Sequence, residues 1–242
     1  MAYDPSFLRK RLGIDFPLIG LYDAPDAGAF EPVVSPPPDR HTCVFAFFED
    51  WREGRTLCLT RKNFGCGGAG AALWSVSTRS RGEYVNFLAG TEGLKCSPDV
   101  MGAWLDRRRT YSPVHPHILI GPMRPGMESH LLTVTFFVNP DQLASLVIGA
   151  HYRHDLSGPD PVRAPFGSGC MQLLTCFDDI ARPQAVIGAT DIAMRPFLDE
   201  CALAFTVTVP MFEQLCALDE GSFLARPFLK RLQKARRESR NR

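Results

Sequence analysis

The chain has 242 residues, 45% of them hydrophobic, so it can bury a full core and is not expected to be disordered. Its 27 basic and 26 acidic residues nearly cancel, which leaves no overall field to attract nucleic acid or an anionic membrane. The first twelve residues lack the apolar core of a signal peptide, and no apolar run is long enough to cross a membrane. We therefore expect a cytoplasmic protein with neither nucleic acid nor a membrane as partner.

Strands and helices alternate along the first half of the chain. Short apolar runs bounded by turn residues predict the strands, and the segment between the first strand and the first helix is too rich in proline and glycine for regular structure. Ser97 is the expected cap of one helix, with Pro98 at its first position. The predicted strands are 16–23, 56–60 and 117–123, and the predicted helices are 43–52, 98–108 and one that begins at 69–74.

The second half shows the same alternation, with Asn139 and Pro140 opening a helix. The segments TVTFFVNPDQLASLV and AFTVTVPMFEQLCAL share a strand, a proline and a helix in register. We expect the α+β class, with a mixed sheet in one domain over 1–229 and a possible pseudo-twofold repeat of 14–123 and 131–218. Coincidence is the alternative, because any two strand–helix units look somewhat alike. The predicted strands are 131–138, 184–193 and 203–209, and the predicted helices are 140–155, 170–180 and 211–218.

The last residues, 230–242, form a basic tail with seven basic residues and one acid. A solvated helix end that frays is the favoured interpretation, because most basic tails do nothing more specific.

Two of the eight cysteines lie among glycines at predicted helix starts, Cys66 in NFGCGGAGAALW and Cys170 in PFGSGCMQLL, and Cys43 opens a third helix. Amides of a first helical turn stabilise a thiolate and lower the thiol pKa, and glycine lets a ligand approach the backbone. If Cys43 and Cys170 occupy equivalent helix starts, they would face one another across a cleft. A tight turn with cysteine as a small hydrophobe is the alternative. The glycines predicted to line the site are Gly65, Gly67, Gly68, Gly167 and Gly169.

The chain has no CxxC pair, so a zinc ribbon or a thioredoxin-type motif is not expected. Cys96 lies in a predicted loop and is a candidate further ligand. The only histidine next to a candidate nucleophile is His41, a weak signal for an enzyme with a cysteine nucleophile. Core packing is the expected role of Cys58, Cys176, Cys201 and Cys216.

Three functions fit these thiols. In the first, Cys43, Cys66 and Cys170 ligate an iron–sulfur cluster or another metal, with Cys96 or a non-protein ligand completing the set. In the second, the same hollow binds a small anionic or planar ligand. In the third, Cys66 acts in thiol chemistry with a redox partner. The aromatic residues expected to line the hollow in the second function are Phe45, Phe64 and Phe166.

From Ile14 to Leu218 the sequence resembles the family called domain of unknown function 169. The resemblance rests on a succession of features: Cys43 opening a helix, the strand TLCLT, the segments RKNFGCGGAGAALW and FFVNPDQLASLVIGAHY, and then FGSGCMQLL. The part NFGCGGAGAAL is the most specific. The family has no established activity, so the resemblance implies a fold and a location for the site and no reaction. The residues that match the family pattern are Asn63, Cys66, Gly67, Gly68, Asn139, Pro140, Gln142 and Leu143.

Overall fold

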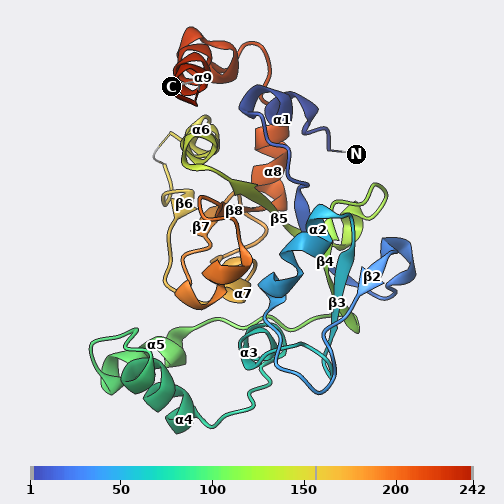
Figure 1. The fold of residues 1–242 in the computed structure, drawn as a ribbon, viewed down its shortest axis with the longest axis vertical. Coiled ribbons are helices and arrows are strands. Elements are labelled where there is room, and N and C mark those ends of the chain that lie inside the picture. Colours follow the sequence, from blue (N-terminus) through green and yellow to red (C-terminus); the bar gives the residue numbers. More distant parts are fainter. Residues whose placement is uncertain (1–2, 156, 241–242) are drawn as a thin grey trace.

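A computed structural model describes residues 3–155 and 157–240. One mixed sheet of eight strands, in the order β2-β3-β4-β1-β5-β8-β7-β6, runs through the molecule (Figure 1). The outermost pairs, β2–β3 and β6–β7, are parallel, and the pairs between them are antiparallel. The strands are β1 Ile19–Ala24, β2 Val33–Val34, β3 Thr56–Thr60, β4 His117–Pro122, β5 Leu131–Val138, β6 Val162–Arg163, β7 Ala185–Gly188 and β8 Leu203–Thr208.

The two halves of the sheet have equivalent strand orders: β1, β2, β3 and β4 of one half correspond to β5, β6, β7 and β8 of the other. One edge reads β2-β3-β4-β1 and the other reads β6-β7-β8-β5, with matching pair directions, and the two halves meet at the antiparallel β1–β5 pair. The helices and the mixed sheet establish the predicted α+β class. The symmetry concerns strand order and direction, so a repeat at the level of sequence remains a prediction.

Helices cover both faces of the sheet, which divides the core in two. In β4, Ile118 and Ile120 face one apolar cluster and Leu119 faces the other, as the two-residue period of a strand requires. One cluster lies under α1 Ser6–Leu12, α6 Pro140–His151 and α8 Val209–Cys216. The other lies under η2 Val44–Phe47, α2 Phe48–Arg52, α3 Gly67–Trp74, α7 Gly169–Gln172 and η5 Ile192–Phe197.

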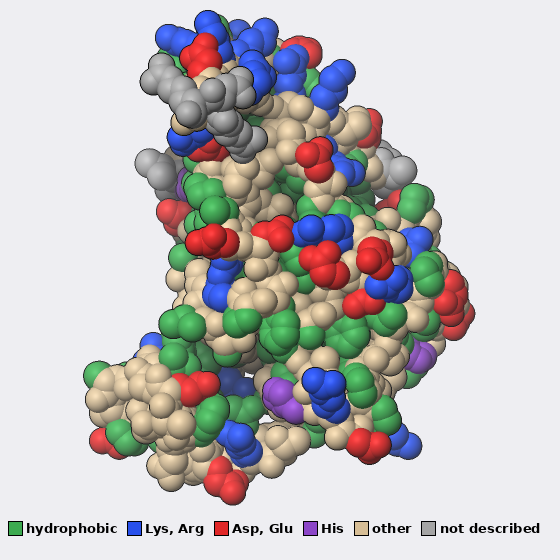
Figure 2. Space-filling model, in the orientation of Figure 1, with side chains coloured by type: hydrophobic (Ala, Val, Ile, Leu, Met, Phe, Trp, Pro, Cys, Tyr) green, Lys and Arg blue, Asp and Glu red, His purple; other side chains and the backbone are tan. Residues whose placement is uncertain are grey.

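A small lobe projects from this body (Figure 1). It consists of α4 Arg81–Val85, the π-helical turn η3 Asn86–Thr91 and α5 Pro98–Arg107. Two hydrogen bonds of 2.8 Å from Arg81 to the carboxylate of Asp106 join α4 to α5. Figure 2 shows a hollow between this lobe and the body. The remaining short turns are η1 Gly28–Phe30, η4 Glu128–His130 and η6 Phe223–Ala225.

Several predicted elements are shorter than expected. The first half of the helix expected at 43–52 is the 3-10 turn η2, which starts after Cys43 without a side-chain cap. The helix expected at 170–180 is α-helical only in α7 and continues as turns. The strand expected at 184–193 stops at Gly188, because Ala189 adopts a left-handed conformation with φ of 61° and breaks the extended chain.

The basic C-terminal segment is a helix, α9 Pro227–Arg240, and it contacts the body. Arg236 donates to both carboxylate oxygens of Asp141, at 2.6 and 2.9 Å, and the Gln233 amide donates to the carbonyl of Arg11 at 2.8 Å. Lys and Arg side chains gather over this helix (Figure 2). The described part of the segment is therefore helical and has two polar contacts with the body, and fraying of its end stays a prediction.

A buried carboxylate, Asp23 at the end of β1, anchors the segment that returns from the lobe to the sheet. It accepts hydrogen bonds from the Tyr111 hydroxyl at 2.8 Å and from the amides of Val114 and His115 at 2.7 and 2.9 Å. The Tyr111 amide in turn donates to the carbonyl of Ala72 in α3. Burial, followed by the hydrogen bond to Asp23, raises the pKa of Tyr111, so this hydroxyl stays a donor.

We predict that Asp23→Asn destabilises the protein by about 2 kcal/mol, because the charged acceptor shared by three donors becomes a neutral amide. Chemical denaturation measures the free energy of unfolding. Asp15→Asn, at an exposed aspartate, is the matched control and should change it by less than about 0.5 kcal/mol. Equal effects of the two substitutions would contradict the anchoring role.

Candidate functional site

The fold brings together the three segments that carry Cys43, Cys66 and Cys170. Cys43 precedes η2, Cys66 is the N-cap of α3, and Cys170 lies in α7. A backbone hydrogen bond of 3.1 Å from Thr42 to the carbonyl of Gly65 holds the first two segments side by side. α3 packs against α7, so the third segment meets the second.

The thiols of Cys66 and Cys170 converge over Gly68. A methyl group placed on Gly68 would lie 3.6 Å from the Cys170 sulfur and 3.7 Å from the Cys66 sulfur. The Ser168 hydroxyl lies 4.0 Å from the same point. Two sulfurs and a hydroxyl, from segments about a hundred residues apart in the sequence, therefore lie close to the Cα atom of Gly68, which carries no side chain.

Hydrogen bonds orient these groups. The amide of Ala69 donates to the Cys66 sulfur at 3.5 Å, and the Ser168 hydroxyl lies 3.2 Å from the Cys170 sulfur. The carboxylate of Asp191, at the start of η5, accepts from the Gly169 amide at 3.2 Å. Sequence reasoning missed Ser168 and Asp191. The signal for Asp191 was its place as a cap before the apolar run IAM, which places a carboxylate at a helix start.

Burial dominates the ionisation of two of the thiols. Burial is the main reason that the pKa of Cys43 is raised to about 11; the charges of Cys66 and Asp191 contribute in the same direction, and a backbone hydrogen bond from Phe45 opposes them. Burial also raises the pKa of Cys170, followed by the charge of Cys66, while the Ser168 hydroxyl opposes the change. The expectation of lowered pKa values at helix starts is therefore wrong for Cys43 and Cys170. Both stay protonated at neutral pH unless a cation lies beside them.

The lobe supplies a hydroxyl to the same region. A methyl group on Gly67 would lie 2.9 Å from the Thr78 hydroxyl and 3.2 Å from the Tyr84 hydroxyl. Burial raises the pKa of Tyr84, the charge of Arg108 lowers it, and the charges of Cys66 and Cys170 raise it. The Tyr84 hydroxyl is thus within electrostatic reach of both thiols and of Arg108.

The other glycines named from the sequence have packing roles. Gly65 has a positive φ of 78°, and a methyl group there would lie 2.6 Å from the Thr42 carbonyl. A methyl group on Gly169 would lie 2.1 Å from the Met194 sulfur and 2.5 Å from the Phe45 ring. Gly167 faces Cys176 and Met171.

The aromatic residues expected around the hollow separate in the structure. Phe45 packs on Gly169, and Phe64 packs on Gly70. Phe166 instead pairs with Trp104 of the lobe.

The remaining cysteines fall into two groups. Cys58 is buried, and Cys176 and Cys216 are half-buried, as expected for apolar packing. Cys96 and Cys201 are exposed, so the expected core role of Cys201 is wrong: it lies in a surface turn before β8. All eight thiols are free. Within residues 3–155 and 157–240, no group of three or more His, Cys, Asp or Glu side chains is already arranged to hold a metal ion.

Comparison with known proteins places the chain in a family. A family model described as an uncharacterised ArCR, the domain of unknown function 169, matches residues 8–217. The chain belongs to this family. No curated protein and no solved structure matches the chain. Across the described part of this family member, no helix is both long and apolar enough to cross a membrane.

The space over Gly68 gives a test of thiol access. We predict that Gly68→Ala leaves stability unchanged or raises it by up to about 1 kcal/mol, because alanine favours a helix and its methyl meets both sulfurs at ordinary contact distance. The same methyl should slow alkylation of Cys66 by iodoacetamide, measured by mass spectrometry. Gly82→Ala in α4, where a methyl would meet nothing within 4 Å, is the control and should leave the rate unchanged. Equal rates in both variants would show that Gly68 does not control access.

Proposed function

We propose that this protein binds a cofactor through cysteine thiolates, with Cys43, Cys66 and Cys170 as ligands of an iron–sulfur cluster. The observation that supports it is the convergence of the Cys66 and Cys170 sulfurs over Gly68, with the Cys43 segment tied to Gly65. Thiolates are the protein ligands that such clusters use. Exposed Cys96 or a non-protein ligand completes the set.

The thiols and the nearby carboxylate of this site favour the binding of a cation. Burial raises the pKa of Cys43 and of Cys170, and the charges of neighbouring groups, Cys66 and Asp191 among them, act in the same direction, so ionising either of these two thiols is unfavourable. A bound iron centre offsets that repulsion. Because the described side chains are not already arranged as a ligand set, binding requires the thiols to rotate and to release their protons.

Proton release makes binding depend on pH. With the pKa of Cys43 raised to about 11, that thiol is protonated at pH 7, and each thiol that ionises on binding releases one proton. We predict that the affinity for Co²⁺, a coloured probe of thiolate ligation, rises about tenfold per pH unit for each proton released. The thiolate-to-cobalt absorption measures it. Affinity that is independent of pH would exclude these protonated thiols as ligands.

The direct test is the iron and acid-labile sulfide content of protein prepared without oxygen. We predict a brown protein that contains both, and loss of most of that content in Cys66→Ser and in Cys170→Ser. Cys216→Ser is the matched control, because Cys216 is a half-buried free thiol in α8, on the opposite face of the sheet. A colourless, iron-free protein after reconstitution would contradict the proposal.

A second function, thiol redox chemistry, is favoured by the shared position of the Cys66 and Cys170 sulfurs. Oxidation of both thiols to a disulfide gives up two protons and two electrons, which diamide accepts in a test reaction. The expected result for iron-free protein is one Cys66–Cys170 disulfide by peptide mapping, reversible with dithiothreitol. Diamide products distributed over the exposed Cys96 and Cys201 would contradict this function.

A further inference from the structure

A cavity lies between the end of α5 and the turns after α7. It has a volume of about 180 Å³, and Arg107, Arg108, Trp104, Phe166 and Thr175 are among its lining residues. The lobe and the body each contribute one wall. The thiol cluster lies elsewhere, since Cys66 and Cys43 do not line this cavity.

One wall of the cavity is aromatic. The rings of Trp104 and Phe166 meet edge to face, with centroids 5.0 Å apart at 71°. Phe166 is 40% exposed, although large apolar side chains are usually covered. The ammonium group of Lys95 lies 3.8 Å from the Phe166 ring centroid. This wall therefore offers ring surface to a planar group next to a positive charge.

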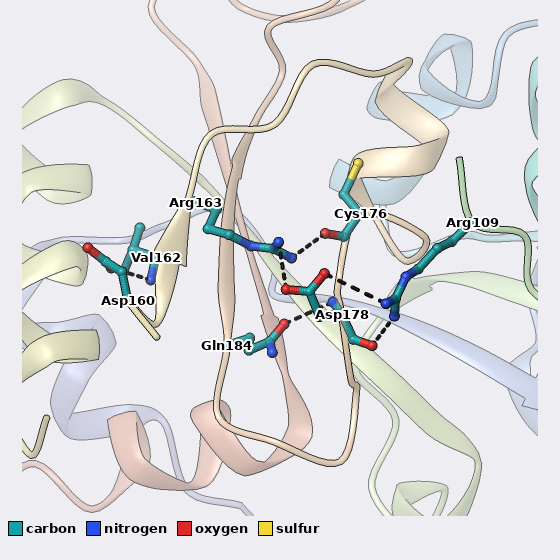
Figure 3. Close-up of polar contacts among 7 residues, drawn as sticks. All are labelled: Arg109, Asp160, Val162, Arg163, Cys176, Asp178 and Gln184. Carbon is teal, nitrogen blue, oxygen red and sulfur yellow. Dashed lines mark hydrogen bonds and ion pairs between the residues drawn. The ribbon is translucent and has the colours of Figure 1, made fainter. Parts of the chain in front are cut away.

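The lining carries a surplus of positive charge. Figure 3 shows Asp178 between Arg109 and Arg163, with the Cys176 side chain pointing away from them. Arg163 pairs with the Asp178 carboxylate at 2.7 Å, and Arg109 lies 4.0 Å from it and donates to the Asp178 carbonyl. The one carboxylate of the lining is thus already paired. Among the described residues, Arg107 and Arg108 have no acidic partner in ion-pair contact.

Thr175, which lines the same cavity, has a hydroxyl without a hydrogen-bond partner among the described residues. Its side chain is only 7% exposed. A buried hydroxyl without a partner is unfavourable, and in native proteins most buried polar groups have a protein or water partner. The hydroxyl oxygen is almost wholly covered, so a ligand in the cavity satisfies it once the Thr175 side chain turns toward the cavity.

We propose that this cavity binds a small aromatic anion, a planar ring that carries a carboxylate or a phosphate. The ring packs on Trp104 and Phe166, the anionic group pairs with Arg107 and Arg108, and a ligand oxygen meets the Thr175 hydroxyl. Guanidinium groups suit carboxylates and phosphates because their donors match two oxygens at once. This site does not depend on the cysteine site, and either can fail without the other.

Phenyl phosphate and benzoate are the probes, with phenol and inorganic phosphate as partial probes that lack the charge or the ring. Calorimetry of the full chain measures affinity. We expect at least one of the two aromatic anions to bind about tenfold or more tightly than phenol, and more tightly than inorganic phosphate, with affinity that falls as salt is added. No binding of either aromatic anion, or equal binding of the partial probes, would overturn the proposal.

Substitutions of the lining residues test whether the aromatic anion binds in this cavity. Arg108→Gln should weaken it about tenfold or more, because a charge-assisted pair is lost. Thr175→Val should weaken it several-fold while thermal stability stays equal or rises, which separates a ligand-binding hydroxyl from a structural one. Arg237→Gln, at an exposed arginine on α9, is the matched control and should change nothing. Unchanged affinity in both cavity variants would place the ligand elsewhere and overturn the assignment.

Discussion

The contact between α3 and α7 is the constraint on which both sites depend. α3 follows β3 in one half of the sheet and α7 precedes β7 in the other, so this contact joins the halves on one face. Buried hydrogen bonds to β5 and to the segment after β7 fix the position of α7. The Thr133 hydroxyl of β5 donates to the carbonyl of Leu173 at 2.7 Å, and the Gln172 amide donates to the Thr190 hydroxyl at 2.6 Å. These buried donors hold α7, and with it Cys170 and Thr175, against the central strands.

The projecting lobe links the thiols to the cavity. Tyr84 of α4 reaches the thiols, while Trp104 of α5 and Arg108 after it line the cavity. The charge of Arg108 also acts on Tyr84, so the two regions share an electrostatic environment. They differ in the ligand that would stabilise them, because buried thiols gain from a cation and unpaired arginines gain from an anion. One surface can therefore serve two ligands of opposite charge without competition for the same side chains.

Sequence reasoning located the thiols and missed most of their surroundings. Glycine-flanked cysteines at helix starts are local patterns, so Cys66 was recognisable as the cap of α3 from NFGCGG alone. Residues that reach the site by tertiary packing give no local sign of it, which is why Tyr84 was missed and why the cap pattern of Asp191 did not reveal its contact with Gly169. Thiol ionisation was mispredicted for the same reason: the helix dipole is visible in sequence, and the burial that outweighs it at Cys170 depends on the whole fold.

Close packing requires glycine at several positions near the thiols, and Gly68 is not one of them. At Gly65, Gly70 and Gly169 a methyl group would lie 2.6 Å or less from neighbouring atoms, so close packing explains the absence of a side chain there. At Gly68 the nearest atoms are the sulfurs at 3.6 and 3.7 Å, a distance at which alanine fits. Alanine would also favour the helix, by less than the roughly 1 kcal/mol of a helix interior because Gly68 lies in the first turn. Packing and helix propensity both permit a methyl group at this position, and what its absence provides is room for a methyl-sized group next to two thiols.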